Sequence, residues 1–86
     1  MKPRELMRRI RLRNFANISF DDFVRLVQAY GFRLQRTAGS HHIYRHAGIR
    51  HELSLQPDRS GDAKPYQVRQ FLTLVERYRL SAEGIE

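Results

Sequence analysis

The sequence contains no cysteine, so it can form neither a disulfide framework nor a zinc–thiolate site. It has no stretch approaching the roughly 20 consecutive apolar residues that a transmembrane helix needs. It also has no apolar run of signal-peptide length after its basic N-terminus. We therefore expect a cytoplasmic protein with no membrane partner. Internal repeats and low-complexity tracts are lacking too, and 86 residues suit one compact domain.

Positive charge is abundant and unevenly placed. The chain has 16 Lys and Arg residues against 9 Asp and Glu residues, a net charge of +7. Residues 1–16 hold six of the basic residues and one acidic residue, whereas residues 17–86 hold ten and eight. This distribution predicts a basic arm or short helix over residues 1–16, followed by a single domain over residues 17–86. Such an arm suits a polyanion such as nucleic acid, or it can simply aid solubility.

Three segments have the apolar spacing of helices. Residues 4–12 form a short one, in which Leu6 and Ile10 can dock the arm onto the domain as an alternative to an electrostatic role. Residues 20–30 follow the N-cap residue Ser19 and end before Gly31, which is free to take a positive φ. Residues 65–78 begin with Pro65, a residue favoured in the first helical turn.

Three short segments between these helices have the pattern of strands. We predict strands over residues 32–36, 41–46 and 49–56, separated by tight turns, and a polar loop over residues 57–64. Short turns favour an antiparallel meander. The element order α-α-β-β-β-α therefore predicts an α+β two-layer sandwich: a three-stranded antiparallel sheet with helices on one face and a short first helix.

The densest chemical signal is the segment 39–46, in which His41, His42 and His46 lie close to Arg36 and Arg45. Histidine is suited to proton transfer near neutral pH, and arginine binds phosphate. RNA carries its own nucleophile, the ribose 2′-OH, so a histidine base beside cations can cleave RNA without a metal ion. His42 and His46 can also share a strand face as a metal pair. No cysteine or acidic motif completes a zinc set, so we expect no metal and no cofactor.

Several motifs together resemble the signature of HicA toxins, the RNA-cleaving partners of HicAB toxin–antitoxin pairs. They are Gly31-Phe32, Arg36, residues 39–46, Leu55-Gln56-Pro57 and residues 63–70. The resemblance extends from about Ser19 to Leu80. It implies a double-stranded-RNA-binding-like fold, cleavage of mRNA with one essential histidine, and neutralisation by a HicB antitoxin.

The resemblance also assigns roles to individual residues. The family's catalytic histidine directly follows a Gly-Ser step, which makes His41 the candidate here and His42 the second choice. Gly39 would let the turn approach a phosphate because it has no Cβ. The side chains that would contact the RNA backbone are Arg36, Ser40, Arg45 and Lys64. Tyr44 and Tyr66 are either core or rim residues, or they stack on bases.

The sequence departs from the family's pattern in two places. Residues 1–16 are additional, and the segment Gln56-Pro57-Asp58 has no histidine where many members carry one, so the leaving-group acid is unassigned. Two alternatives to a nuclease stay open at this point. One is a non-catalytic nucleic-acid-binding module of the same double-stranded-RNA-binding-like fold, and the other is an interaction protein whose basic surface docks an acidic antitoxin.

Overall fold

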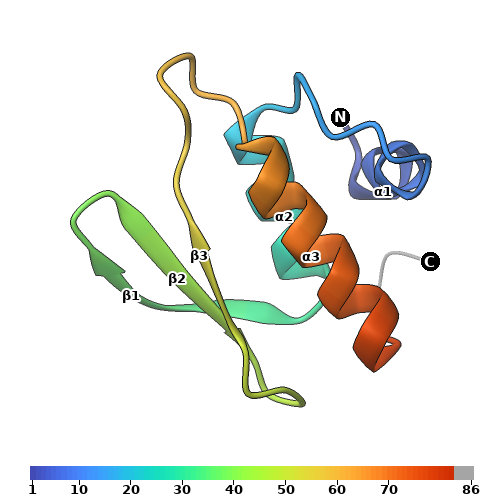
Figure 1. Ribbon diagram of the computed structural model, residues 1–86. Coiled ribbons are helices and arrows are strands. Elements are labelled where there is room, and N and C mark those ends of the chain that lie inside the picture. The colour runs from blue at the N-terminus through green and yellow to red at the C-terminus, as the bar shows by residue number, and fades with distance from the viewer. Residues whose placement is uncertain (83–86) are drawn as a thin grey trace.

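The computed structural model describes residues 1–82 and contains the helices and strands in the expected order (Figure 1). The elements are α1 (Pro3–Arg11), α2 (Phe20–Ala29), β1 (Phe32–Ala38), β2 (His41–His46), β3 (Glu52–Leu55) and α3 (Pro65–Tyr78). The predicted α+β class with a three-stranded antiparallel sheet is confirmed. Over the described residues, no helix combines the length and apolar character needed to cross a membrane.

The sheet has the strand order β1-β2-β3, and both strand pairs are antiparallel. The pairing of β1 with β2 runs from Phe32 opposite His46 to Ala38 opposite His41. The register shifts between Leu34 and Arg36, so that Gln35 is the extra residue of a β-bulge. Beyond the bulge, each side chain of β1 points to the face opposite to the one that simple alternation predicts.

The strand boundaries differ from the predicted ones at β1 and β3. β1 is two residues longer than expected because its pairing with β2 continues to Ala38. β3 covers residues 52–55 rather than 49–56. The N–H of Ile49 donates to the carbonyl of His46 in the preceding turn, and the N–H of Gln56 donates to the side-chain oxygen of Gln67. Local partners therefore replace the ladder at both ends of β3.

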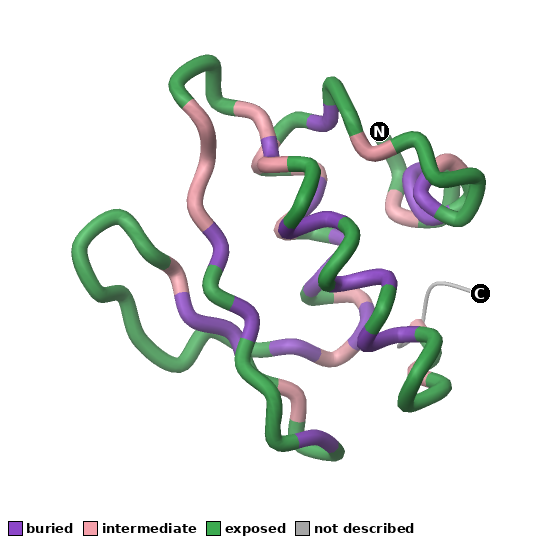
Figure 2. The backbone as a smooth tube through the Cα atoms, in the orientation of Figure 1, coloured by how far each residue is buried: buried purple, intermediate pink, exposed green. Residues whose placement is uncertain are grey.

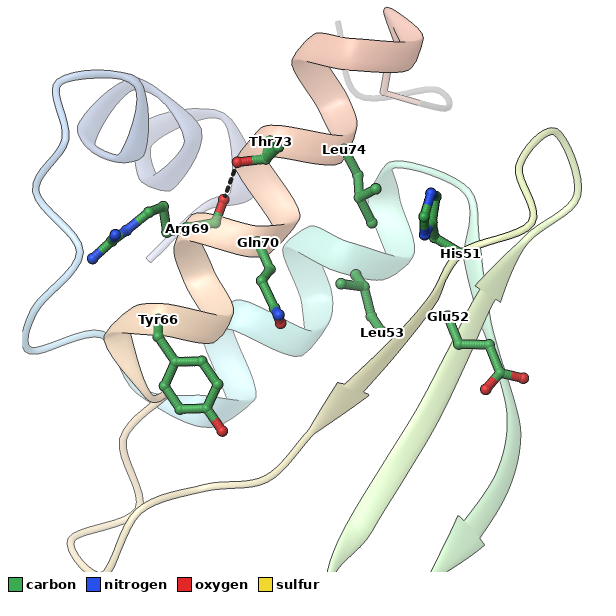
Figure 3. A pocket seen from close by; sticks show the side chains of 8 residues that line it. All are labelled: His51, Glu52, Leu53, Tyr66, Arg69, Gln70, Thr73 and Leu74. Carbon is green, nitrogen blue, oxygen red and sulfur yellow. Dashed lines mark hydrogen bonds between the residues drawn. The ribbon is translucent and has the colours of Figure 1, made fainter.

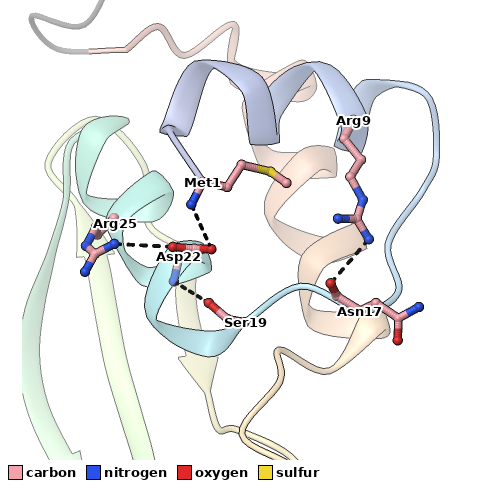
Figure 4. Close-up of polar contacts among 6 residues, drawn as sticks. All are labelled: Met1, Arg9, Asn17, Ser19, Asp22 and Arg25. Atoms are coloured by element: carbon pink, nitrogen blue, oxygen red, sulfur yellow. Dashed lines mark hydrogen bonds and ion pairs between the residues drawn. The ribbon is translucent and has the colours of Figure 1, made fainter.

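Helix α2 begins at the residue that its local signals predict and ends one residue earlier than expected, with Tyr30 as its C-cap. The Ser19 hydroxyl accepts a hydrogen bond from the Asp22 N–H at 3.1 Å, as an N-cap residue does (Figure 4). The Asp22 carboxylate also pairs with the α-amino group of Met1 and with Arg25. The hydrogen bond from the Met1 amine is the main reason that the pKa of Asp22 lies below its ordinary value. Gly31, which follows the C-cap, has the expected positive φ, +92°.

The core lies between the sheet and the pair of helices α2 and α3 (Figure 2). Phe71 of α3 is at its centre. The rings of Phe23, Tyr30 and Phe32 meet the Phe71 ring edge-on or tilted, with centroids 5.7–6.0 Å apart. Because the helices cover one face of the sheet, the opposite face is left open, and we call it the open face.

Helix α1 packs on the side of α2 and α3 that is remote from the sheet (Figure 1). Its apolar residues Leu6, Met7 and Ile10 are all buried in the common core. Arg9 donates to the carbonyl of Ala16, and this hydrogen bond holds the segment that follows the helix in place. Residues 3–11 therefore form a docked helix, and an electrostatic role for its basic residues stays a prediction. The other arginines of α1, namely Arg4, Arg8 and Arg11, are exposed.

The loop between β3 and α3 is held by a network of hydrogen bonds. The Asp58 carboxylate accepts from the hydroxyl and N–H of Ser60 and from the N–H of Asp62, at 2.8–2.9 Å. These bonds, the Ser60 hydroxyl first, lower the pKa of Asp58 below its ordinary value of 3.8. The Gly61 carbonyl accepts from the N–H of Phe20, so the loop is also joined to the start of α2. Together these hydrogen bonds fix the path of the loop that leads to Lys64, the residue before α3.

Candidate active site

The open face collects most of the side chains that the sequence singled out. Tyr44, Leu53 and Leu55 belong to the core, so the residues that alternate with them along β2 and β3 point away from the helices. The bulge in β1 brings Arg36 to the same side, because it lies opposite Ile43. The open face of the sheet thus carries Arg36, His41, Ile43, Arg45, Glu52 and Ser54.

His41 is exposed at the start of β2, directly after the turn formed by Gly39 and Ser40. Gly39 has a φ of +63°, and a Cβ added there would meet no atom within 4 Å. His41 Nδ1 lies 3.1 Å from Ser54 Oγ of the neighbouring strand β3. This hydrogen bond orients the imidazole ring through Nδ1. If Nδ1 carries the hydrogen, Nε2 keeps a free lone pair that can accept a proton.

A chain of polar contacts connects the turn before His41 to the start of α3. Gln56 Nε2 donates to Ser40 Oγ at 2.7 Å, and Lys64 Nζ donates to Gln56 Oε1 at 3.1 Å. The backbone N–H of Gln56 donates to Oε1 of Gln67, a residue only 2% exposed, whose Nε2 donates to the hydroxyl of Tyr66. Gln67 thus fixes the point where Gln56 leaves β3. The Lys64 ammonium is consequently linked to the Gly39-Ser40 turn through the side chain of Gln56.

Arg36 and Arg45 share one carboxylate on the open face. Arg36 Nη1 lies 3.3 Å from Glu52 Oε2, and Arg45 Nη1 lies 3.6 Å from the same oxygen. Both arginine side chains are about half exposed, so each ion pair adds little to stability. The arrangement nevertheless holds two guanidinium groups around one anionic oxygen, which is the arrangement that would bind a phosphate group.

Three residues close to His41 in sequence lie on the helix side of the sheet. His42 packs against the Phe20 ring, with centroids 5.8 Å apart, and its buried Nδ1 has no hydrogen-bond partner among the residues that the structure describes. His46 Nδ1 accepts from the Gly48 N–H at 2.9 Å, which is a structural role. Tyr44 is buried, and burial raises the pKa of its hydroxyl. Neither His42 nor Tyr44, the two secondary candidates, therefore lies beside His41, and a buried Tyr44 ring offers no face for a base.

The fourth histidine does not join the site either. His51 precedes β3, and its ring faces that of Tyr78, with centroids 6.0 Å apart. His41 is thus the single histidine of the open face. Within residues 1–82, no three His, Cys, Asp or Glu side chains gather as metal ligands would.

The sequence alone did not identify three residues that position the site. Ser54 and Gln56 alternate with the core residues Leu53 and Leu55, so the sequence predicts that they lie on the other face of the sheet. It does not predict which residues they contact. Gln67 precedes Phe71 by four residues, on the buried stripe of α3. A polar residue in an apolar stripe was the available signal, because a buried amide is expected to have hydrogen-bond partners.

Comparison with known proteins identifies the family. No curated protein and no solved structure gives a significant match to the chain. A family model described as the HicA toxin of bacterial toxin–antitoxin systems matches residues 20–76, which run from the start of α2 almost to the end of α3. The match covers well over half of the chain and includes the whole sheet, the Gly39-Ser40-His41 segment and Lys64, so the chain belongs to the HicA toxin family.

Proposed function

We propose that this toxin is a cytoplasmic endoribonuclease that cleaves mRNA without a metal ion, with His41 as its catalytic residue. The observation that carries the proposal is the placement of His41: it is exposed on the open face and oriented by Ser54 at 3.1 Å. The other three histidines lie elsewhere. A group that serves only to bind RNA has no need of such an oriented, titratable ring.

In the proposed reaction, Nε2 of His41 takes the proton from a ribose 2′-OH. The 2′-oxygen then attacks the adjacent phosphorus, and the bond from phosphorus to the 5′-oxygen breaks. Negative charge accumulates on the phosphoryl oxygens during this step, and nearby cations lower its energy. Lys64, held by Gln56 beside the Ser40 turn, is the ammonium group best placed for this role. The donor of the proton to the 5′-oxygen is left unassigned.

The remaining site residues would bind the RNA backbone. Arg36 and Arg45 would take a phosphate in place of the Glu52 carboxylate that now lies between them. The open, positive-φ turn at Gly39 would let a phosphate approach the backbone and the Ser40 hydroxyl. Contacts of this kind supply affinity rather than sequence choice.

Family membership implies a cognate antitoxin, and we propose that it is of the HicB type. The net charge of +7 favours an acidic partner. An antitoxin that covers the open face would exclude RNA from His41. The proposed antitoxin therefore neutralises the toxin by occupying the surface that the substrate needs.

Substitution of His41 by Ala tests the catalytic assignment. Purified His41→Ala protein should stay folded and lose about 10²- to 10⁴-fold in the rate of RNA cleavage. His46→Ala is the matched control, because it removes a histidine from the other end and the other face of β2. That control should melt at a lower temperature yet cleave RNA. Cleavage by His41→Ala at the wild-type rate would overturn the assignment.

Two further results would replace the proposed mechanism. Cleavage should persist in excess chelator, so activity that is lost on chelation and restored by a divalent ion requires a metal. If purified wild-type protein binds RNA and never cleaves it, the chain is instead a nucleic-acid-binding module.

A further inference from the structure

A groove separates β3 from α3, away from the open face (Figure 3). It is a cavity of about 370 Å³ with Leu53 and Leu74 at its base. Tyr66, Gln70 and Thr73 line the helix side, and their spacing places them on one face of α3. The groove is therefore bounded by a strand on one side and by a helix face on the other, with room for apolar side chains between them.

The strand that borders the groove has a free edge. β3 is the last strand in the order β1-β2-β3, and within the described part of the chain β2 alone pairs with it. Among residues 1–82, the backbone groups of Glu52–Leu55 have no hydrogen-bond partner beyond that ladder. An unpaired strand edge is a template for another extended chain. Its combination with an apolar groove suits a peptide that adds a strand and inserts alternate side chains.

The charge around the groove indicates which chain would bind. Arg69 is one of the lining residues, and its guanidinium points away from β3 (Figure 3) to lie over the Phe15 ring, where no carboxylate in the described part of the chain pairs with it. The acidic residue of the lining is Glu52, whose carboxylate is already occupied by Arg36 and Arg45. The unbalanced charge is therefore positive. Pairing with a second copy would bring two chains of net charge +7 together, which disfavours a homodimer.

We propose that an extended, acidic segment of the cognate antitoxin pairs with the free edge of β3 as a fourth strand and places apolar side chains in the groove. The inference rests on membership of the toxin family, and it does not depend on RNA cleavage. Tyr66 would connect this contact to the candidate active site, because its hydroxyl accepts from Gln67, which also holds Gln56. The antitoxin would then hold the toxin at this edge in addition to covering the open face.

The test uses a synthetic peptide of about ten residues in which Glu and Val alternate, long enough to span β3. It is titrated into the full chain while backbone amide signals are followed by NMR. We expect saturable shifts and slowed exchange at Leu53–Leu55, and binding at least about tenfold weaker for the same peptide with Lys in place of Glu. Gln70→Trp, which fills the groove, should abolish binding, whereas Gln28→Trp on the exposed side of α2 should not.

Four results would overturn the proposal. They are the absence of binding up to millimolar peptide, equal binding of the Lys peptide, unchanged binding by Gln70→Trp, and shifts confined to the open face. Sedimentation of the unliganded chain decides the remaining alternative. A dimer that Gln70→Trp dissociates would show that the groove belongs to a second copy of the toxin.

Discussion

Ile10 provides the sharpest test of whether α1 belongs to the folded core. Its side chain is 0% exposed between α1 and the other helices, whereas that of Leu12, just after the helix, is 77% exposed. Ile10→Ala removes a fully buried branched side chain and leaves a cavity. Substitutions of this kind cost about 2–5 kcal/mol. Since a small domain is stable by only about 5–15 kcal/mol, the loss should be a large part of the total.

The expected change in melting temperature follows from the size of the chain. For a domain of this length, each kcal/mol lowers the melting temperature by roughly 4–8 °C. Ile10→Ala should therefore melt at least about 8 °C below the wild type, while Leu12→Ala should change the free energy of unfolding by less than about 0.5 kcal/mol. Circular dichroism during heating and urea titration measures both quantities. Equal melting of the two variants would refute the docking of α1 as a source of stability.

The exposed arginines of α1 allow its charge to be tested separately from its packing. Arg4, Arg8 and Arg11 lie on one outer face of the helix. Their joint replacement by Gln should leave the melting temperature nearly unchanged. If α1 also contributes affinity for RNA, the salt dependence of binding should become less steep by somewhat under one log–log unit for each phosphate that the helix no longer neutralises. An unchanged slope would leave α1 with a structural role alone.

Three further substitutions test separate parts of the site and its supports. Glu52→Gln should tighten RNA binding in a filter assay, because it removes the carboxylate that competes with phosphate for two arginines; weaker binding would mean that Glu52 instead holds those arginines in their binding pose. Gly39→Ala should cost about 1–2 kcal/mol in urea unfolding through its positive φ alone, and a neutral result would contradict the turn geometry. The lowered pKa of Asp58 gives stability that is present above about pH 3.8 and is lost as the pH falls; Asp58→Asn should flatten this acid limb, and an unchanged limb would refute the contribution.

The helices and the turn before His41 could be predicted because their signals are local. A capping serine at position 19, a glycine with positive φ at position 31 and a proline at position 65 mark helix boundaries within a few residues of chain. The Gly39-Ser40-His41 segment is equally local, since it carries both the turn and the candidate catalytic histidine. Such features depend little on the rest of the fold, so the sequence alone is enough to indicate them.

The features that sequence could not specify depend on contacts between distant segments. The docking of α1 requires the outer apolar surfaces of α2 and α3, which form only when those helices pair. The apolar–polar alternation of residues 32–36 gives no sign of the bulge at Gln35, because a bulge is defined by the partner strand. The contacts of Gln67 with Gln56 likewise appear only after β3 and α3 have come together.

The bulge at Gln35 makes the length of β1 as important as its composition. If the same sequence paired without the bulge, Arg36 would turn toward the helices and the side chains that follow it would exchange faces. The bulge therefore keeps a guanidinium out of an apolar layer, although the chemical groups of β1 would be the same without it. Alignments of related chains should accordingly set any one-residue gap in this strand at the bulge. A related chain that lacks the residue at position 35 can pair without a bulge and still present Arg36 on the open face.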